Sequence, residues 1–182
     1  NPKKYNSITL AGPWFSMPKC TSQVTNPSIK NTIVYAEKGK FCGWPANNGV
    51  WSWDNEILVG YSLGKYHEQK SHNFVKPSRS VLCRSLDGGE TWKLEDPDNF
   101  VGDGKETTSC PGNINFAHPE FAMRVDGNSF FISYDKGHNW EGPYSFGDLS
   151  KDERLKGLNI TSRTDYMVLG KKQCMILKSA KP

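Results

Sequence analysis

The chain has 182 residues, of which 36% are hydrophobic and 12% aromatic, and its formal net charge is +4 at pH 7. No run of about 18 apolar residues occurs, which argues against a membrane-spanning helix, and no long basic run occurs, which argues against nucleic-acid binding. The 17 glycines and 11 prolines are typical of many short strands joined by turns.

The first 40 residues are expected to form an N-terminal strand and an entry segment. The strand is SITLAG at 7–12, and a proline-rich connection follows at 13–27. Residues 41–95 are then expected to form a first unit of four strands. Its strands are a run from the Glu37–Gly39 turn towards Trp44, and then NEILVGYSLG, SRSVLCRS and TWKLED.

Residues 96–147 are expected to form a second unit, and residues 148–182 to begin a third. In the second unit an acidic, glycine-rich loop leads to the strand-like runs HPEFAMRVDG, SFFISYD and WEGPYSF. The third unit contains TSRTDYMVLG and QCMILKSA. The segment between these two units, DLSKDERLKGL at 148–158, is the one helix-like stretch, and a loop or a single turn fits it equally well.

Two octapeptides share the frame S-x-D-x-G-x-x-W, namely SLDGGETW at 85–92 and SYDKGHNW at 133–140. Each follows an apolar strand, and their aspartates are 48 residues apart, at 87 and 135. The Asp can accept hydrogen bonds from the N–H groups of its own turn, and the Trp can fold back over the turn. A period of about 40 to 50 residues in a strand-rich chain is typical of a β-propeller with about four strands per blade.

The octapeptides resemble the Asp-box, S-x-D-x-G-x-T-W, of the sialidases and related BNR-repeat proteins. The first matches at every defined position, and the second has Asn139 where Thr is usual. The resemblance extends from about Gly43 to the end of the chain and includes CGWPANNG, HPEFAMR and SRTDY. It implies an all-β fold, a sialidase-like six-bladed β-propeller, of which this chain would be an incomplete arc of about two and a half blades that continues in a longer parent chain.

The resemblance also implies a carbohydrate site at the propeller axis, far from the Asp-boxes, in a secreted or periplasmic protein. Residues that start successive innermost strands would face this axis at the same end. The predicted substrate-binding residues are Trp44, Asn47, His67, His72, His118, Arg163 and Tyr166. The predicted catalytic carboxylates are Glu68, Glu120 and Asp165.

These residues favour a sialidase-like glycoside hydrolase that acts on an acidic oligo- or polysaccharide. Hydrolysis needs a protonated acid and a second carboxylate on opposite sides of the scissile bond. Two alternatives stay open. A polysaccharide lyase would use His, Tyr and Arg side chains on a uronate. A non-catalytic glycan-binding propeller would need only Trp44, Trp51 and Trp53 as stacking platforms beside polar groups.

One position departs from the family pattern, because Gly43 stands where catalytic sialidases carry an arginine in their first innermost strand. In those enzymes that arginine binds the carboxylate of the substrate through two hydrogen bonds. Recognition of sialic acid in the usual way is therefore not predicted from this strand.

No cofactor and no metal are expected. The five cysteines show no C-x-x-C pair and no Cys/His metal spacing. The acidic loop at 96–104 does not fit the EF-hand frame, because Phe100 stands where an oxygen ligand is needed. Cys42 and Cys83 are expected to be free thiols within strands, and a disulfide from Cys20 or Cys110 is the alternative.

Overall fold

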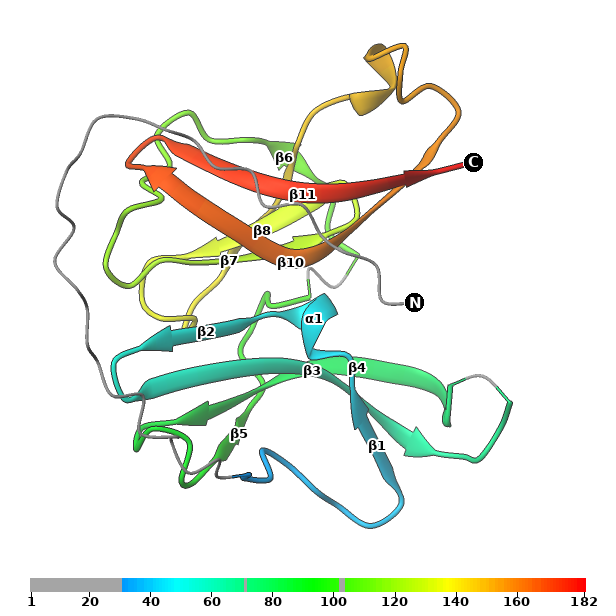
Figure 1. The fold of residues 1–182 in the computed structure, drawn as a ribbon, viewed down its shortest axis with the longest axis vertical. Helices are drawn as coiled ribbons and strands as arrows, with labels where there is room; N and C mark the ends of the chain where they lie inside the picture. The colour runs from blue at the N-terminus through cyan, green and yellow to red at the C-terminus, as the bar shows by residue number, and fades with distance from the viewer. Residues whose placement is uncertain (1–30, 71, 102–103) are drawn as a thin grey trace, which may run out of the picture. The chain divides into compact units, whose positions relative to one another are not determined.

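The computed structural model describes residues 31–70, 72–101 and 104–182. The strand predicted at 7–12 and Cys20 lie outside these residues. The described residues form three sheets of mostly antiparallel strands, so the predicted all-β class is confirmed (Figure 1). In this part of the chain no helix has the length and apolar character that a membrane crossing requires.

The strands are distributed over three sheets. The first sheet contains β1 (Lys40–Gly43), β2 (Val50–Trp53), β3 (Glu56–Tyr66), β4 (Phe74–Ser85) and β5 (Lys93–Glu95). The second contains β6 (Thr108–Ser109), β7 (Ala122–Asp126), β8 (Ser129–Ser133) and β9 (Glu141–Ser145). The third contains β10 (Asn159–Gly170) and β11 (Gln173–Lys181). The described residues also contain two short helical elements, α1 (Pro45–Asn48) and a 3₁₀ turn at Leu149–Lys151. This turn is the only helical part of the described segment 148–158.

In the first sheet, β1 and β2 are two halves of one edge strand. Both pair with β3, whose other edge pairs with β4. Gly43 of β1 lies opposite Ser62, and Val50 of β2 lies opposite Val59. Six residues of the edge strand, 44–49, therefore leave the sheet, whereas only two residues of β3, 60 and 61, lie between the same two pairs.

The first and second sheets pack through one buried apolar cluster. Alternation along the strands places Leu58 of β3, Leu82 of β4 and Phe131 of β8 between these sheets. The remaining buried members of the cluster are Trp51, Phe100, Ala122 and Trp140. All of them are less than one-tenth exposed, so this cluster supplies much of the apolar burial that stabilises the pair of sheets.

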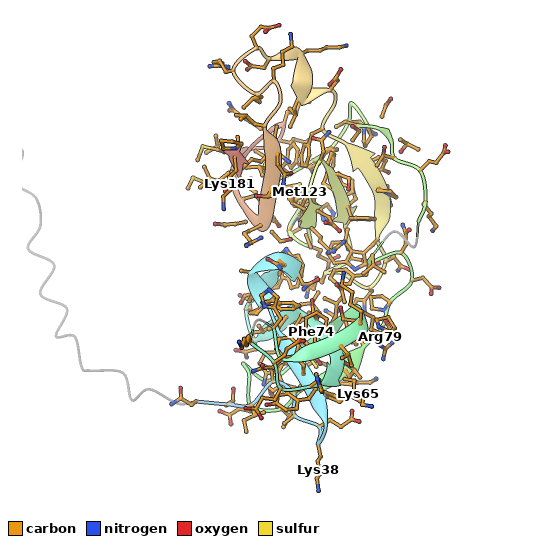
Figure 2. All side chains as sticks on the ribbon, turned by 90° about the vertical axis from the view of Figure 1, so that its right-hand side faces the viewer. Lys38, Lys65, Phe74, Arg79, Met123 and Lys181 are labelled. Carbon is orange, nitrogen blue, oxygen red and sulfur yellow. The ribbon has the colours of Figure 1, made fainter. Side chains whose placement is uncertain are left out.

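The opposite face of the second sheet packs against the third sheet. Met123, in the middle of β7, belongs to this second cluster and is labelled in Figure 2. The other buried members are Ile114, Phe121, Val125, Phe130 and Ile132, and Tyr166 and Ile176 of the third sheet pack against them. The second sheet is thus covered on both faces, so β7 and β8 are buried along almost their whole length.

The first Asp-box forms the turn between β4 and β5. Ser85 Oγ donates a hydrogen bond to Asp87 Oδ1 (2.7 Å) and accepts one from the Gly89 N–H (2.8 Å). The Thr91 N–H donates to Asp87 Oδ1 (2.9 Å), and its hydroxyl donates to Asp87 Oδ2 (2.6 Å). Trp92 folds back so that its indole N–H donates to the carbonyl of Gly89 (3.0 Å). These bonds, first of all those from Thr91, hold the pKa of Asp87 well below its usual range.

The second Asp-box forms the equivalent turn between β8 and β9 with the same bonds. Ser133 Oγ donates to Asp135 Oδ1 (2.7 Å) and accepts from the Gly137 N–H (2.8 Å). The Trp140 indole donates to the Gly137 carbonyl (3.0 Å). Asn139 replaces the usual Thr, and its amide donates to Asp135 Oδ2 at 2.6 Å, the distance that the Thr hydroxyl has in the first turn. The predicted equivalence of the two turns is confirmed.

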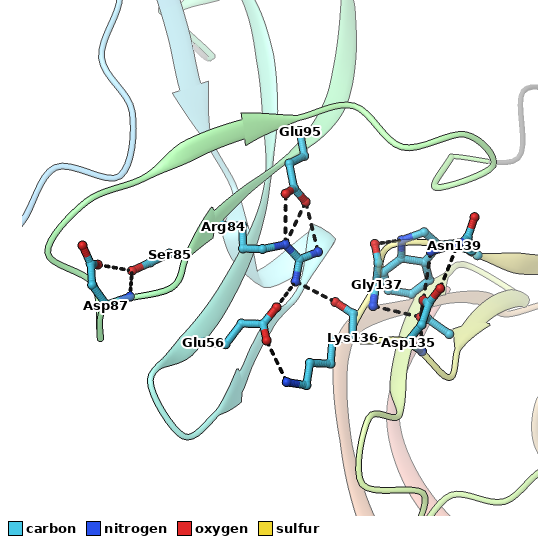
Figure 3. A network of polar contacts seen from close by, with 11 residues as sticks. Glu56, Arg84, Ser85, Asp87, Glu95, Asp135, Lys136, Gly137 and Asn139 are labelled. Carbon is cyan, nitrogen blue, oxygen red and sulfur yellow. Dashed lines mark hydrogen bonds and ion pairs between the residues drawn. The ribbon is translucent and has the colours of Figure 1, made fainter.

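A buried network of charges joins the second of these turns to the first sheet (Figure 3). The Arg84 guanidinium is only 4% exposed, and its Nη1 donates to Glu56 Oε1 (2.6 Å) and to the carbonyl of Lys136 (3.0 Å). Its Nε donates to Glu95 (3.0 Å), and Lys136 Nζ reaches Glu56 Oε2 (2.8 Å). Burial raises the pKa of Glu56, but the bonds from Lys136 and Arg84 outweigh burial and lower it overall.

The four cysteines of the described residues, Cys42, Cys83, Cys110 and Cys174, are free. Burial raises the pKa of the Cys42 and Cys83 thiols. These two side chains therefore stay protonated and act as small apolar groups in the first sheet.

Replacing the Asp of the second turn tests its structural role. We expect Asp135→Ala to lower the free energy of unfolding by about 1–2 kcal/mol, because three hydrogen bonds to the carboxylate are lost and the buried Ser133 hydroxyl loses its acceptor. Urea denaturation followed by tryptophan fluorescence measures this change. Asp165→Ala is the control, since Asp165 is exposed and makes no hydrogen bond in the described part of the chain. Equal stability of the two variants would contradict the role given to the turn.

Candidate functional site

Residues 44–49, which leave the edge strand of the first sheet, build the candidate site. Trp44 begins this excursion with φ at 60°, in the left-handed region that bulky residues rarely adopt. Gly49 ends it with φ at 99°, and the Gly49 N–H donates to the Pro45 carbonyl (2.7 Å). Strained backbone of this kind is concentrated at binding and active sites.

The excursion is held against β3 by a buried amide and a glycine. Asn48 is 2% exposed, and its Nδ2 donates to the Trp44 carbonyl (3.2 Å) and to Ser62 Oγ (3.3 Å). Gly60 of β3 lies directly beneath, and its N–H donates to the Gly49 carbonyl (2.8 Å). A Cβ atom at position 60 would lie 2.6 Å from the Asn48 carbonyl oxygen, so only glycine permits this close approach.

The third sheet also contacts the excursion, through Thr164 of β10. The Thr164 hydroxyl lies 3.0 Å from the carbonyl of Asn47 and accepts a hydrogen bond from the Val125 N–H (3.1 Å). One side chain therefore links α1, the second sheet and the third sheet. The excursion lies where residues of all three sheets meet, because α1 contacts β3, β7 and β10.

Trp44 is fixed in place by other aromatic rings. Its ring centroid lies 4.9 Å from that of Phe41, 5.0 Å from that of Phe74 and 4.9 Å from that of His72. The contacts with Phe74 and His72 are edge-to-face, a favourable geometry for aromatic pairs. Trp44 is only partly buried by them.

A hollow of about 450 Å³, here called the outer hollow, opens beside Trp44. It is lined by Trp44, Pro45, Ala46, Asn47, His72 and Arg163. Arg163 is exposed and makes no hydrogen bond or ion pair with the described residues. Four of the ten predicted site residues thus lie around one hollow, and the lining contains an unpaired cation but no carboxylate.

A second hollow of about 360 Å³, here called the inner hollow, adjoins the outer one and shares Asn47 and Arg163 with it. Its other lining residues are Asn48, Ser62, Ser80, Arg124, Val125, Asp126, Gly127, Thr161 and Ser162. None of these was predicted as a site residue. The sequence contains one signal that could have revealed the inner hollow. Ser62 and Ser80 occupy the face of β3 and β4 that is filled further along by Leu58 and Leu82, so small polar side chains replace large apolar ones there.

His118 and Glu120 lie away from both hollows, in the turn that precedes β7. The Glu120 N–H donates to His118 Nδ1 (3.2 Å), and the Lys136 N–H donates to the Glu120 carbonyl (3.0 Å). They therefore lie beside the second Asp-box turn. The second Asp-box turn follows β8 as the first follows β4, so β7 corresponds to β3. His118 and Glu120 therefore precede the equivalent of β3 and not the equivalent of the edge strand β1–β2.

Asp165 and Tyr166 show how β10 divides its side chains. Ser162, Thr164 and Tyr166 bond to the second sheet, whereas Asp165 is exposed and Arg163 lines both hollows. The Tyr166 hydroxyl accepts a hydrogen bond from the Met123 N–H (3.2 Å), and burial raises its pKa to about 12. Tyr166 is thus a packing residue, and Asp165 lies beside Met167 and Met175, outside the outer hollow.

The remaining predicted residues lie in the β3–β4 loop or in the core. His67 and Glu68 are exposed, in the same loop as His72, and the His67 N–H donates to the Asn73 carbonyl (3.1 Å). Trp51 is 7% exposed within the cluster between the first and second sheets, and Trp53 packs against that cluster. Trp44 is therefore the one predicted stacking tryptophan that reaches a hollow.

In the described part of the chain no group of three or more His, Cys, Asp or Glu side chains is arranged to hold a metal ion. Comparison with protein-family models, with curated proteins and with solved structures gives no match to this chain.

Gly60 offers a test of how the excursion is positioned. We expect Gly60→Ala to displace α1 and to lower the free energy of unfolding by about 1–3 kcal/mol, because the added methyl group meets backbone atoms of Asn48. Gly112→Ala is the matched control, since nothing lies within 4 Å of a Cβ atom at that position. Thermal unfolding measures the difference, and a Gly60→Ala protein as stable as the control would contradict the close approach.

Proposed function

We propose that the outer hollow binds an acidic unit of a glycan, with its carboxylate on Arg163 and its ring against Trp44. The observation that carries this proposal is an unpaired, exposed arginine and a fixed tryptophan in one hollow without a carboxylate. An arginine that makes no ion pair within the protein keeps its hydrogen-bond donors for a ligand.

The chemistry of the lining suits such a ligand. The planar guanidinium of Arg163 can donate two parallel hydrogen bonds to a carboxylate. The indole of Trp44 offers an apolar face to a sugar ring, and the amide of Asn47 and the imidazole of His72 can bond to hydroxyl groups. Because Arg163 is exposed, salt would weaken its attraction for the carboxylate.

At the level of the fold, we propose that the three sheets are successive blades of a sialidase-like propeller, in a secreted or periplasmic protein. The support is the repeated turn: both Asp-boxes have the same place in their sheets and the same hydrogen bonds. This likeness supports a carbohydrate ligand by analogy only, since one fold serves many functions.

Replacing Arg163 tests the binding proposal. We expect Arg163→Ala to weaken the affinity for N-acetylneuraminic acid or for D-glucuronic acid at least tenfold, because a charge-assisted hydrogen bond contributes about 1.5–3 kcal/mol. Titration calorimetry measures the affinity, with glucose as the neutral comparison. Arg154→Ala is the control, since Arg154 is an exposed arginine whose partner is Asp152. Equal affinity of the two variants for both acids would contradict the proposal.

A second candidate function is β-elimination on a uronate, which is favoured by the presence of His72 and Arg163 in the same hollow. In this reaction a base removes the proton at C5, the bond from C4 to the leaving oxygen breaks, and a C4–C5 double bond forms. His72 would take the proton, and Arg163 would neutralise the carboxylate as charge moves onto it. The departing oxygen would take a proton from water.

Glycoside hydrolysis stays a prediction from the sequence. Of the three predicted carboxylates, Glu68 lies in the loop that carries His72, Glu120 lies beside the second Asp-box turn, and Asp165 lies outside the outer hollow. Hydrolysis at this hollow would therefore depend on Glu68 as the general acid, together with a second carboxylate from outside the lining.

Two substitutions in the β3–β4 loop distinguish these reactions. We expect His72→Gln to slow elimination on a uronate polymer at least a hundredfold, the usual contribution of a general base, while Glu68→Gln leaves the rate unchanged. The absorbance of the unsaturated product follows elimination, and new reducing ends without that absorbance report hydrolysis. His138→Gln, at another exposed histidine, is the control. Loss of elimination in Glu68→Gln but not in His72→Gln would assign the base to Glu68 and not to His72. Binding of the polymer without either product would contradict both reactions and favour a non-catalytic binding role.

A further inference from the structure

We propose that the inner hollow is a second subsite, which binds a neutral, hydroxyl-rich sugar unit next to the acidic unit in the outer hollow. This inference rests on the function proposed for the outer hollow and specifies the class of ligand. The ligand would be an oligosaccharide in which an acidic unit is joined to a neutral one.

The inner hollow exists because the space between the first and second sheets changes from apolar to polar. Leu58 and Leu82 fill this space at one end and are fully buried. Further along the same two strands, Ser62 and Ser80 stand opposite each other and face the second sheet. Their side chains are too small to fill the space that leucines occupy, so a hollow of about 360 Å³ with hydroxyl-bearing walls remains. This volume is within the range of about 300–1,000 Å³ of ligand sites.

On the facing strand, Arg124 holds the carboxylate of Asp126 at the wall of the inner hollow. Arg124 is 5% exposed, and its Nη1 donates to the Phe100 carbonyl (3.0 Å) while its Nη2 donates to Asp126 Oδ2 (3.1 Å). The rings of Phe100 and Phe131 lie within 5.4 Å of the guanidinium carbon. The Asp126 side chain is nevertheless 59% exposed. Arg124 is thus a positioning residue, and Asp126 is an open acceptor for hydroxyl groups.

The guanidinium of Arg124 also has an unsatisfied donor. Its Nε is buried and has no hydrogen-bond partner in the described part of the chain. Buried donors without partners are rare, and each calls for a reason. While Nε stays unbonded, Nη1 and Nη2 bond to the Phe100 carbonyl and to the Asp126 carboxylate, which lines the inner hollow.

The two hollows differ in their charged residues, and this difference determines which sugar unit of the ligand each hollow would bind. They share Asn47 and Arg163, so one ligand can occupy both. Arg163, the one charged residue that lines the outer hollow, is shared by both, whereas the other two charged residues of the inner hollow, Arg124 and Asp126, pair with each other. The inner hollow therefore adds no unpaired cation for a second acidic unit, while the hydroxyl groups of a neutral unit can donate to the exposed Asp126 carboxylate.

Titration calorimetry with matched sugars tests this inference. The probes are N-acetylneuraminic acid with sialyllactose, and D-glucuronic acid with an aldobiouronic acid of one uronate and one neutral sugar. We expect the unsubstituted protein to bind one of these oligosaccharides about tenfold more tightly than its acidic monosaccharide. Ser80→Leu fills the inner hollow, and we expect it to remove this gain while the affinity for the monosaccharide stays the same. Ser52→Leu, at an exposed position of β2, is the control.

A further variant keeps the test independent of folding. Asp126→Asn retains the size of the side chain and removes its charge, and we expect it to reduce the gain for the oligosaccharide about threefold without changing monosaccharide binding. A gain that survives Ser80→Leu, or that never appears although a monosaccharide binds, would overturn the inner subsite alone. Absence of binding of all four sugars would overturn the function proposed for the outer hollow and the inner subsite with it.

Discussion

The position of the second sheet against the first depends on one buried charge. Burying an arginine is unfavourable by several kcal/mol unless its hydrogen bonds are made within the protein. For Nη1 and Nε of Arg84 the partners are Glu56 and Glu95 of its own sheet and the Lys136 carbonyl of the second Asp-box turn, while the buried Nη2 has an ion-pair contact with Glu95. Without that turn Arg84 would lose one of these hydrogen bonds, so the spacing that brings the Lys136 carbonyl to the guanidinium stabilises the pair of sheets.

This spacing explains why the polar hollows can exist. The network around Arg84 and the apolar cluster with Leu58 fix the sheets together, so the space near Ser62 and Ser80 need not be filled for stability. The excursion at 44–49 borders the same space and is tied to the third sheet by Thr164. The packing of the sheets therefore supports the hollows, and the residues that line them are free to be polar.

Alternation and turn chemistry made the strands and both Asp-box turns predictable, because these signals are local. The resemblance to Asp-box proteins, and not a local signal, grouped Trp44, Asn47, His72 and Arg163, which line one hollow. It also grouped Glu120 with them, although Glu120 lies beside the second Asp-box turn, because the sequence does not say which strand of a unit follows the HPE segment. The inner hollow was missed because serines on a strand are ordinary, and only the leucines beside them in space make them informative. The α1 turn was missed because four residues carry no periodic signal.

Neighbouring residues of strand β10 are under different constraints. Ser162, Thr164 and Tyr166 are committed to neighbouring sheets, and any change at these positions disturbs hydrogen bonds that hold the fold. Arg163 and Asp165, one residue away on the same strand, make no such commitment. During evolution, variants at the odd positions can be sampled without loss of folded protein. Under the proposed function, the ligand preference set by such a strand can change between related chains while the architecture stays constant, and divergence in specificity would appear there first.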